Sequence, residues 1–320
     1  MMLRSAVFAL FVLTVVTPVI AQDQYPVGTV KMVVGFAPGG GNDILARVLA
    51  QKLGEHYNTS FIVDNRPGAN GIIAVEAVKH ADANGQTILV GPSGSMIFNP
   101  ILLKNIPYDP INDFAPIAMV GSFPLLVVVK ADSPLKSLAD LVTMTRAKPG
   151  AVNFSSASTS FQMATEIFSQ RAGIRMQNVA YRGSAPAATA VLTGDVTVNF
   201  GDISAVLPLV QGGQLRPLAV TTGKRIPSVS EIPTIAESGY PGFEMVFWSG
   251  LFLPVGTPEP IRSGLQTQVQ EIVSTPVVVD YMRMLGIEPS FMPGPELAVR
   301  IKKDIEAYRP IADAAGIKPE

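Results

Sequence analysis

The sequence contains no cysteine, only two histidines and a single tryptophan among its 320 residues. Without thiols the chain forms neither disulfides nor thiolate metal sites, and His56 and His80 stand in no metal-ligand spacing such as HExxH. Charged residues make up only 15% of the chain, with 24 basic and 25 acidic side chains. This balance gives no electrostatic reason to expect nucleic acid or anionic lipid as a partner. We therefore expect no metal, no cofactor and no nucleic acid.

The longest apolar stretch of the sequence lies at its N-terminus. Arg4 supplies a positive charge, residues 6–16 form an apolar region, and Val19-Ile20-Ala21 is a small-residue cleavage site. This pattern predicts a signal peptide over residues 1–21 and an exported, periplasmic protein. No later segment has the roughly 18 consecutive apolar residues of a transmembrane helix, so we expect a soluble mature chain.

Residues 31–53 predict a strand, a glycine turn and a helix. Met32–Phe36 is a short apolar run of the kind found in strands buried on both faces. Gly39–Gly41 carry no Cβ, so the backbone there can approach a ligand closely. Asn42 or Asp43 is the expected N-cap of the helix that follows. The unpaired N–H groups of its first turn would form an anion site without a charged side chain.

The glycine spacing argues against nucleotides as the anion. Three contiguous glycines followed by Asn42-Asp43 match neither GxxxxGK[ST] nor GxGxxG. A small carboxylate fits the turn better, although the same pattern also opens α/β domains that bind no ligand.

Strands and helices alternate along most of the chain, which predicts an α/β fold with parallel strands and right-handed crossovers. A first βαβαβ unit ends near residue 124, a second α/β unit follows, and three C-terminal helices return to the first. Two chain crossings near Phe123 and Met245 would then act as a hinge. The predicted organisation is a monomer with a first domain in two parts, residues 22–123 and 245–320, and a second domain over residues 124–244.

A second polar turn, Ser155–Ser160, follows the predicted strand Val152–Phe154 and precedes a helix. Two helix N-termini that face each other across a cleft could clamp one carboxylate. The alternative is a serine-rich helix cap without a ligand.

Three further residues end predicted strands at the same edge. Ser93 lies in a small-residue turn, and Arg182 could pair with a carboxylate or form a structural ion pair. Asp202 is expected as a helix cap; if it faces the cleft, it would repel a carboxylate and favour an amine, a hydroxyl or a protonated acid. The candidate ligand-binding residues are Phe36, Ala37, Gly39, Gly40, Gly41, Ser93, Ser155, Ser156, Ser158, Thr159, Arg182 and Asp202.

Catalytic patterns are weak in this sequence. Gly91-Pro92-Ser93-Gly94 resembles a nucleophile elbow only loosely, because the GxSxG spacing is absent. We therefore expect a binding protein and not an enzyme, and a secreted hydrolase is the most distant alternative.

Several motifs in their shared order resemble those of the extracytoplasmic solute receptors of tripartite tricarboxylate transporters, the Bug or TctC-like family, over essentially the whole mature length. The matching stretches include Gly35–Asp43, Asn65–Gly71, Pro107–Pro110, Tyr181–Gly183 and Pro241–Phe243.

This resemblance implies a two-domain periplasmic binding fold of type II, a Venus flytrap that closes over a small mono- or dicarboxylate, aliphatic or aromatic, and delivers it to membrane permease subunits. It places the carboxylate at Phe36–Gly41 and Ser155–Thr159. The second turn departs from the family in having Ala157, Thr159, Gln162 and Met163. An alternative on the same fold is a ligand-sensing partner of a signalling protein.

Overall fold

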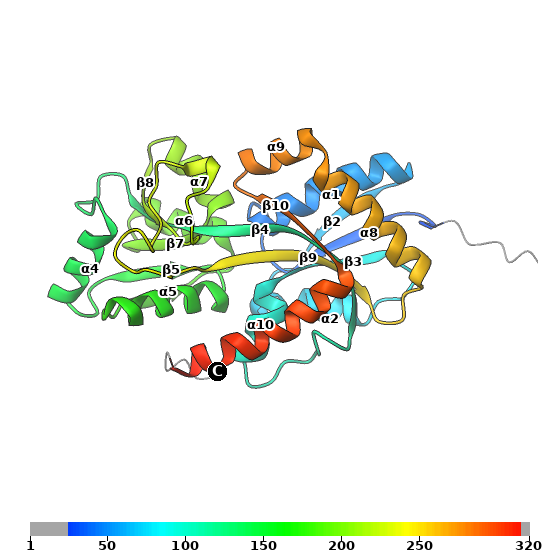
Figure 1. Ribbon diagram of the computed structural model, residues 1–320, viewed down its shortest axis with the longest axis horizontal. Coiled ribbons are helices and arrows are strands. Elements are labelled where there is room, and N and C mark those ends of the chain that lie inside the picture. Colours follow the sequence, from blue (N-terminus) through cyan, green and yellow to red (C-terminus); the bar gives the residue numbers. More distant parts are fainter. Residues whose placement is uncertain (1–24, 315–320) are drawn as a thin grey trace, which may run out of the picture.

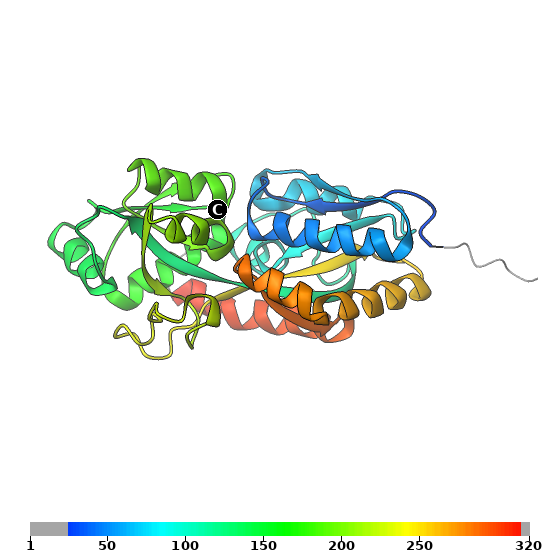
Figure 2. The same cartoon turned by 90° about the horizontal axis from the view of Figure 1, so that it is seen from above.

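The computed structural model describes residues 25–314 as two lobes that lie side by side (Figures 1 and 2). This architecture confirms the predicted two-domain α/β fold. The predicted signal peptide, residues 1–21, lies outside the described residues, and the residue limits of the two domains stay predictions. Among residues 25–314 no helix combines the length and the apolar character needed to cross a bilayer.

The first lobe is built on the predicted βαβαβ unit, whose strands pair in parallel in the order β2-β1-β3. Helix α1 packs against β1 and β2, and α8 from the C-terminal region packs against α1. The elements of this part of the chain are β1 (Val30–Val34), α1 (Gly41–Tyr57), β2 (Phe61–Asn65), η1 (Ala69–Gly71), α2 (Ile72–Lys79), β3 (Thr87–Pro92), the π-helix η2 (Gly94–Phe98), α3 (Asn99–Leu102), α8 (Glu259–Ser274), α9 (Pro276–Met284) and α10 (Gly294–Ala314).

The second lobe has the parallel order β7-β5-β6, with α5 packed on β5 and β7, and α6 and α7 packed near β7. Its first four helices begin within two residues of the starts that the apolar pattern predicts, which are Leu138, Phe161, Ala185 and Ile203. The elements are α4 (Leu138–Ala147), β5 (Asn153–Ser156), α5 (Thr159–Ala172), β6 (Gln177–Ala180), α6 (Ser184–Thr193), β7 (Val198–Asp202), α7 (Ile203–Gln211), β8 (Leu215–Val220) and η3 (Pro227–Val229).

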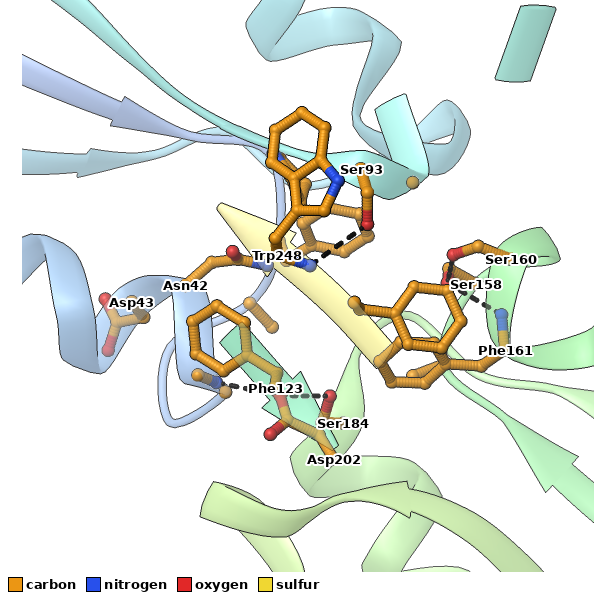
Figure 3. A pocket seen from close by; sticks show the side chains of 18 residues that line it. Asn42, Asp43, Ser93, Phe123, Ser158, Ser160, Phe161, Ser184, Asp202 and Trp248 are labelled. Atoms are coloured by element: carbon orange, nitrogen blue, oxygen red, sulfur yellow. Dashed lines mark hydrogen bonds between the residues drawn. The ribbon is translucent and has the colours of Figure 1, made fainter. Parts of the chain in front are cut away.

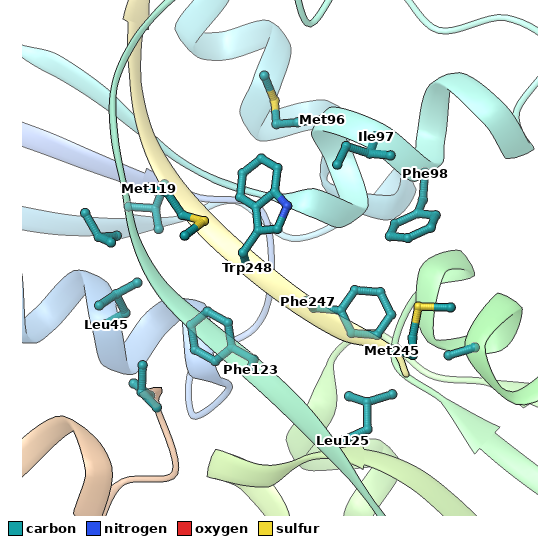
Figure 4. Close-up of a cluster of buried hydrophobic side chains, with 14 of the residues drawn as sticks. Leu45, Met96, Ile97, Phe98, Met119, Phe123, Leu125, Met245, Phe247 and Trp248 are labelled. Atoms are coloured by element: carbon teal, nitrogen blue, oxygen red, sulfur yellow. The ribbon is translucent and has the colours of Figure 1, made fainter. Parts of the chain in front are cut away.

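Two long antiparallel strands, β4 (Phe114–Lys130) and β9 (Val246–Pro254), connect the lobes. The first part of β4 pairs with β9 and with β10 (Glu288–Pro293), whereas its last residues, from Leu125 onward, pair with β7 and β8. Buried side chains of β4, β9 and η2 pack together where the strands pass between the lobes (Figure 4). These side chains belong to one continuous apolar core that extends into both lobes.

Three details of the predicted elements are wrong. Helix α1 begins at Gly41 with Gly40 as its N-cap, not Asn42 or Asp43, because Gly40 is extended (φ −92°, ψ 167°) and its carbonyl already accepts from Ile44 N. Strand β4 begins at Phe114 and continues through two prolines, whereas the apolar pattern predicts a strand only over Leu125–Val129. Strand β10 was not predicted, since two of its six residues are proline, which is unusual within a strand.

Candidate functional site

A narrow cavity lies between the two lobes, at the carboxyl ends of the parallel strands (Figure 3). Its inner part measures about 40 Å³, and it adjoins an outer depression of about 520 Å³ that shares Phe36 and Ala157 in its wall. The inner cavity is lined by Phe36, Ala37, Gly40, Gly41, Asn42, Asp43, Pro92, Ser93, Gly94, Phe123, Ala157, Ser158, Ser160, Phe161, Ser184, Asp202, Phe247 and Trp248.

Seven of the twelve candidate residues lie in the wall of this inner cavity: Phe36, Ala37, Gly40, Gly41, Ser93, Ser158 and Asp202. Arg182 is exposed and lines the outer depression. The hydroxyls of Ser155 and Ser156 are used inside the second lobe, where they donate to Ala187 O and Asn178 Oδ1. Gly39 and Thr159 do not line the inner cavity; their backbone N–H groups donate to Asp43 Oδ2 and Asn70 Oδ1.

The N-terminus of α1 lies at the cavity, but its first N–H is occupied by a side chain of the other lobe. Gly41 N donates to Asp202 Oδ2 at 2.9 Å, and these two residues are 161 positions apart in the sequence. The next two N–H groups, of Asn42 and Asp43, have no hydrogen-bond partner within residues 25–314. The anion site at this helix is thus already partly filled by a carboxylate of the chain itself.

Asp202 has both of the roles that the sequence left open. It caps α7, because its Oδ1 accepts from Ser204 N at 3.1 Å and Ser204 Oγ at 2.6 Å, and its Oδ2 faces the cavity, where Ser184 Oγ also donates at 3.4 Å. Only 4% of the residue is exposed. No ion pair of Asp202 occurs among the described residues. Its negative charge is therefore stabilised by neutral donors and helix N-termini alone.

Asp43 is the second acid of the cavity wall, and its charge is neutralised. Its carboxylate accepts from Arg47 Nε and Nη2, from Gly39 N at 3.0 Å and from Asn65 Nδ2 at 3.0 Å. Burial raises the pKa of the Asp43 carboxyl, but the hydrogen bonds from Arg47, Gly39 and Asn65 outweigh it and lower the pKa below the usual value. These contacts fix the glycine turn against the first turn of α1.

We expect the hydrogen bonds of Asp43 to make the free energy of unfolding depend on pH. A carboxyl whose pKa is lower in the folded state stabilises the fold above its unfolded pKa of about 3.9, and the contribution disappears as the pH falls below that value. Asp43→Asn should therefore lower the free energy of unfolding by about 1.5–3 kcal/mol at neutral pH and by less at about pH 3, below the unfolded pKa. Urea unfolding at both pH values measures this difference, with Asp280→Asn on the exposed face of α9 as control. An equal loss at both pH values would contradict it.

A cluster of three hydroxyls lies on the side of the cavity nearest α5. Ser158 Oγ and Ser160 Oγ are 2.8 Å apart, and Ser158 also caps α5 by accepting from Phe161 N. Ser93 Oγ accepts from Trp248 N at 3.2 Å, which leaves its own proton able to donate. A Cβ built on Gly94 would lie 3.0 Å from Ser160 Oγ, so the β3 and α5 sides of this cluster are adjacent. We call Ser93, Ser158 and Ser160 the hydroxyl cluster.

Five aromatic side chains form much of the remaining wall: Phe36, Phe123, Phe161, Phe247 and Trp248. The rings of Phe161 and Phe247 have centroids 4.8 Å apart, and the Arg300 guanidinium lies 5.8 Å from the centroid of the Trp248 ring. From the sequence alone, Phe36, Phe161 and Trp248 are aromatic residues that could line a pocket, although most such residues lie in the core. Phe123 and Phe247 were missed because they belong to the crossing strands, and no turn or helix signal marks them.

The charges of the wall restrict what the cavity can bind. Its eighteen lining residues include two acids, Asp43 and Asp202, and no lysine, arginine or histidine. Residues 25–314 contain no cluster of three or more acidic, histidine or cysteine side chains able to hold a metal ion. The donors available to an anion are therefore backbone N–H groups, hydroxyls, the Asn42 side-chain amide and the Trp248 indole N–H, with Arg182 in the outer depression.

Comparisons with known proteins agree with this geometry. The family model described as "Tripartite tricarboxylate transporter family receptor" matches residues 45–317. Protein BugT of Bordetella pertussis is 32% identical over 317 residues, which cover 98% of this chain and 97% of BugT.

Two solved structures of Rhodopseudomonas palustris proteins are similar throughout. Rpa4515 with adipate has a TM-score of 0.90 at 34% identity and covers 92% of this chain and 100% of its own. MatC with bound malate has a TM-score of 0.83 at 28% identity and covers 90% of this chain and 99% of its own. The family match, the two-lobed fold and the cavity between helix N-termini agree: the chain belongs to the receptors of the tripartite tricarboxylate transporter family.

Proposed function

We propose that this protein is a periplasmic receptor that binds a small carboxylate between its lobes and delivers it to the membrane subunits of a tripartite tricarboxylate-type transporter. The observation that carries the proposal is the inter-lobe cavity, which two helix N-termini and the hydroxyl cluster supply with donors. The similar proteins Rpa4515 and MatC hold adipate and malate, which supports a carboxylate as the ligand class.

The carboxylate of the ligand belongs beside the hydroxyl cluster, not beside Gly41. Two unit charges 4 Å apart repel by about 4 kcal/mol at an effective dielectric constant of 20, and Asp202 already lies at the α1 N-terminus. One helix end offers an anion about 0.3–1 kcal/mol, and up to about 2 kcal/mol where it is partly buried. Repulsion therefore outweighs attraction at α1, whereas no acid of the cavity wall hydrogen-bonds within the hydroxyl cluster.

The rest of the ligand would lie against the aromatic rings. Phe161, Phe247 and Trp248 present apolar surface next to the hydroxyl cluster, and burial of such surface stabilises a complex by about 25 cal/mol per Å². At the far end a hydroxyl or amine could donate to Asp202, as Ser184 does. Charge-assisted hydrogen bonds of this kind contribute about 1.5–3 kcal/mol.

We expect at least one carboxylate to raise the melting temperature of the mature protein, residues 22–320. A ligand present at 100 times its Kd adds about 2.7 kcal/mol, which corresponds to roughly 5 °C in a chain of this size. The panel is adipate, malate, hexanoate and benzoate at millimolar concentration. Because the single tryptophan, Trp248, lines the cavity, its fluorescence should change with the same ligand.

The panel includes its own control, since the matching amides of each acid keep the body of the ligand and lack the charge. Binding of the acids without binding of the amides supports the carboxylate class. The proposal is wrong if no acid changes the melting temperature or the Trp248 fluorescence and if mass spectrometry detects no acid released from the denatured protein. Uptake of the identified acid by cells that lack the gene tests delivery, and unchanged uptake would contradict the transport role.

A further inference from the structure

Two helices direct their N-termini at the cleft, α1 from the first lobe and α5 from the second, and the first N–H of each is bound by the opposite lobe. Gly41 N donates to Asp202 Oδ2 at 2.9 Å, and Thr159 N donates to Asn70 Oδ1 at 3.4 Å. We infer that Asp202 and Asn70 are reciprocal inter-lobe helix caps, positioning residues that hold the cleft closed. This inference deepens the proposed function, because it names the residues that determine how long the closed cleft retains its ligand.

The cap made by Asp202 is anchored in the second lobe and reaches the first with one atom. Oδ1 is held by Ser204 N and Ser204 Oγ at the start of α7, which leaves Oδ2 directed across the cleft at Gly41. A carboxylate at a helix N-terminus interacts favourably with the helix dipole, and hydrogen bonds to a charged acceptor are stronger than neutral ones. Opening the cleft would remove the Gly41 contact and leave the Ser204 contacts intact.

The cap made by Asn70 is anchored in the first lobe through its backbone. Asn70 has φ +53°, in the left-handed region that costs a non-glycine residue energy. Its carbonyl accepts from Asn99 Nδ2 at 3.1 Å and from Ser95 Oγ at 3.4 Å. Tyr108 OH in turn accepts from Asn99 Nδ2 and donates to Ser95 O at 2.6 Å.

This network explains three buried polar residues that do not line the cavity. Ser95, Asn99 and Tyr108 are each no more than 5% exposed. Ser95 and Asn99 donate to the carbonyl of Asn70, and Tyr108 joins these two residues to each other. Buried polar groups fully joined by hydrogen bonds rigidify the structure around them. The network thus fixes Asn70 in its left-handed conformation, with its side chain at the N-terminus of α5.

The two caps are symmetrical in function, since each lobe provides one acceptor and one helix. Neither depends on the identity of the ligand, because every atom involved belongs to the chain. Loss of either cap should favour the open form and accelerate release of a bound carboxylate. Loss of both should have the larger effect, because the two contacts are made by different segments of the chain.

Two substitutions remove the caps with little damage to the fold. Asn70→Gly deletes the side chain at a position where glycine adopts the positive φ freely, and Asn58→Gly at the C-cap of α1, with φ 49°, is its matched control outside the cleft. Asp202→Asn removes the charge, while asparagine remains an effective N-cap for α7. Asp140→Asn in the first turn of α4 is the control for loss of one acid from the second lobe.

The absence of cysteine allows a direct measurement of closure. Spin labels are attached to two exposed positions by the substitutions Gln51→Cys on α1 and Thr189→Cys on α6. Pulsed electron paramagnetic resonance then gives the distribution of distances between the two labels, without ligand and with adipate. We expect a short-distance component that shrinks in Asn70→Gly and in Asp202→Asn and is unchanged in both controls. We also expect adipate to dissociate about five- to tenfold faster from each variant, because loss of one helix cap costs about 1 kcal/mol. Trp248 fluorescence measures the rate of dissociation.

Identical distance distributions in wild type and in both variants would overturn the inference, as would a wild type without the short component. The distance measurement needs no ligand, so it gives a result even if no acid of the panel binds. Failure of the proposed function, seen as absence of carboxylate binding, is therefore distinguishable from failure of the caps.

Discussion

Gly41→Ala should weaken carboxylate binding at least a hundredfold, about 2.7 kcal/mol, while the protein stays folded. A Cβ at this position would lie 2.5 Å from two ring carbons of Phe123 and 3.0 Å from Asp202 Oδ2. Phe123 lies on the crossing strand β4 and Asp202 in the second lobe, so the added methyl group displaces α1 from both. The cleft cannot close fully, and the contact between Gly41 N and Asp202 is lost.

Titration of Trp248 fluorescence with the acid identified by melting measures this loss. Two other glycines provide controls. At Gly40 the nearest atom to an added Cβ is Ser184 Oγ at 3.6 Å, an ordinary contact, and at Gly264 on α8 there is no atom within 4 Å. Alanine at either position should bind nearly as wild type, and at Gly264 it should stabilise α8 by up to about 1 kcal/mol. Wild-type affinity in Gly41→Ala would exclude close packing at this residue as a requirement for closure.

The contrast between Gly40 and Gly41 illustrates how much of the site can be predicted from the sequence. The strand, turn and helix at residues 31–53 and the helix after Ser155–Ser160 were predicted from apolar periodicity and small-residue turns, which are local signals. The parallel pairing of β1, β2 and β3 was predicted from the alternation of strands and helices, whereas their order in the sheet was not. Local pattern thus located both turns beside the cavity, but it did not distinguish Gly40 from Gly41.

The parts that sequence reasoning missed depend on contacts between distant segments. The Gly41–Asp202 hydrogen bond joins residues 161 positions apart, and no propensity or spacing encodes it. Phe247 reaches the cavity because β9 returns between the lobes after the whole second lobe. The early start of β4 was hidden by Pro116 and Pro124, which lie among residues whose pairing with β9 overrides their low strand propensity. Tertiary pairing decided these features.

Trp248→Ala should lower the free energy of unfolding by about 3–5 kcal/mol, as expected for removal of a large buried aromatic side chain. Trp248 is 2% exposed, its backbone N–H is bound by Ser93 Oγ, and the Arg300 guanidinium lies over its ring. A domain is stabilised by only about 5–15 kcal/mol in total, so this loss is a substantial fraction. It would also remove one wall of the cavity and reduce carboxylate affinity.

Urea unfolding followed by circular dichroism measures the change, because the variant has no tryptophan to report by fluorescence. Trp248→Phe is the matched control: it keeps an aromatic ring on β9 and should lose about 1–2 kcal/mol, since the cavity left behind is smaller. Arg300→Gln isolates the contact over the ring, which contributes about 0.5–1 kcal/mol where the cation is partly exposed. If alanine and phenylalanine at position 248 were equally stable, the indole would be a lining of the cavity alone and not part of the core that joins the crossing strands to η2.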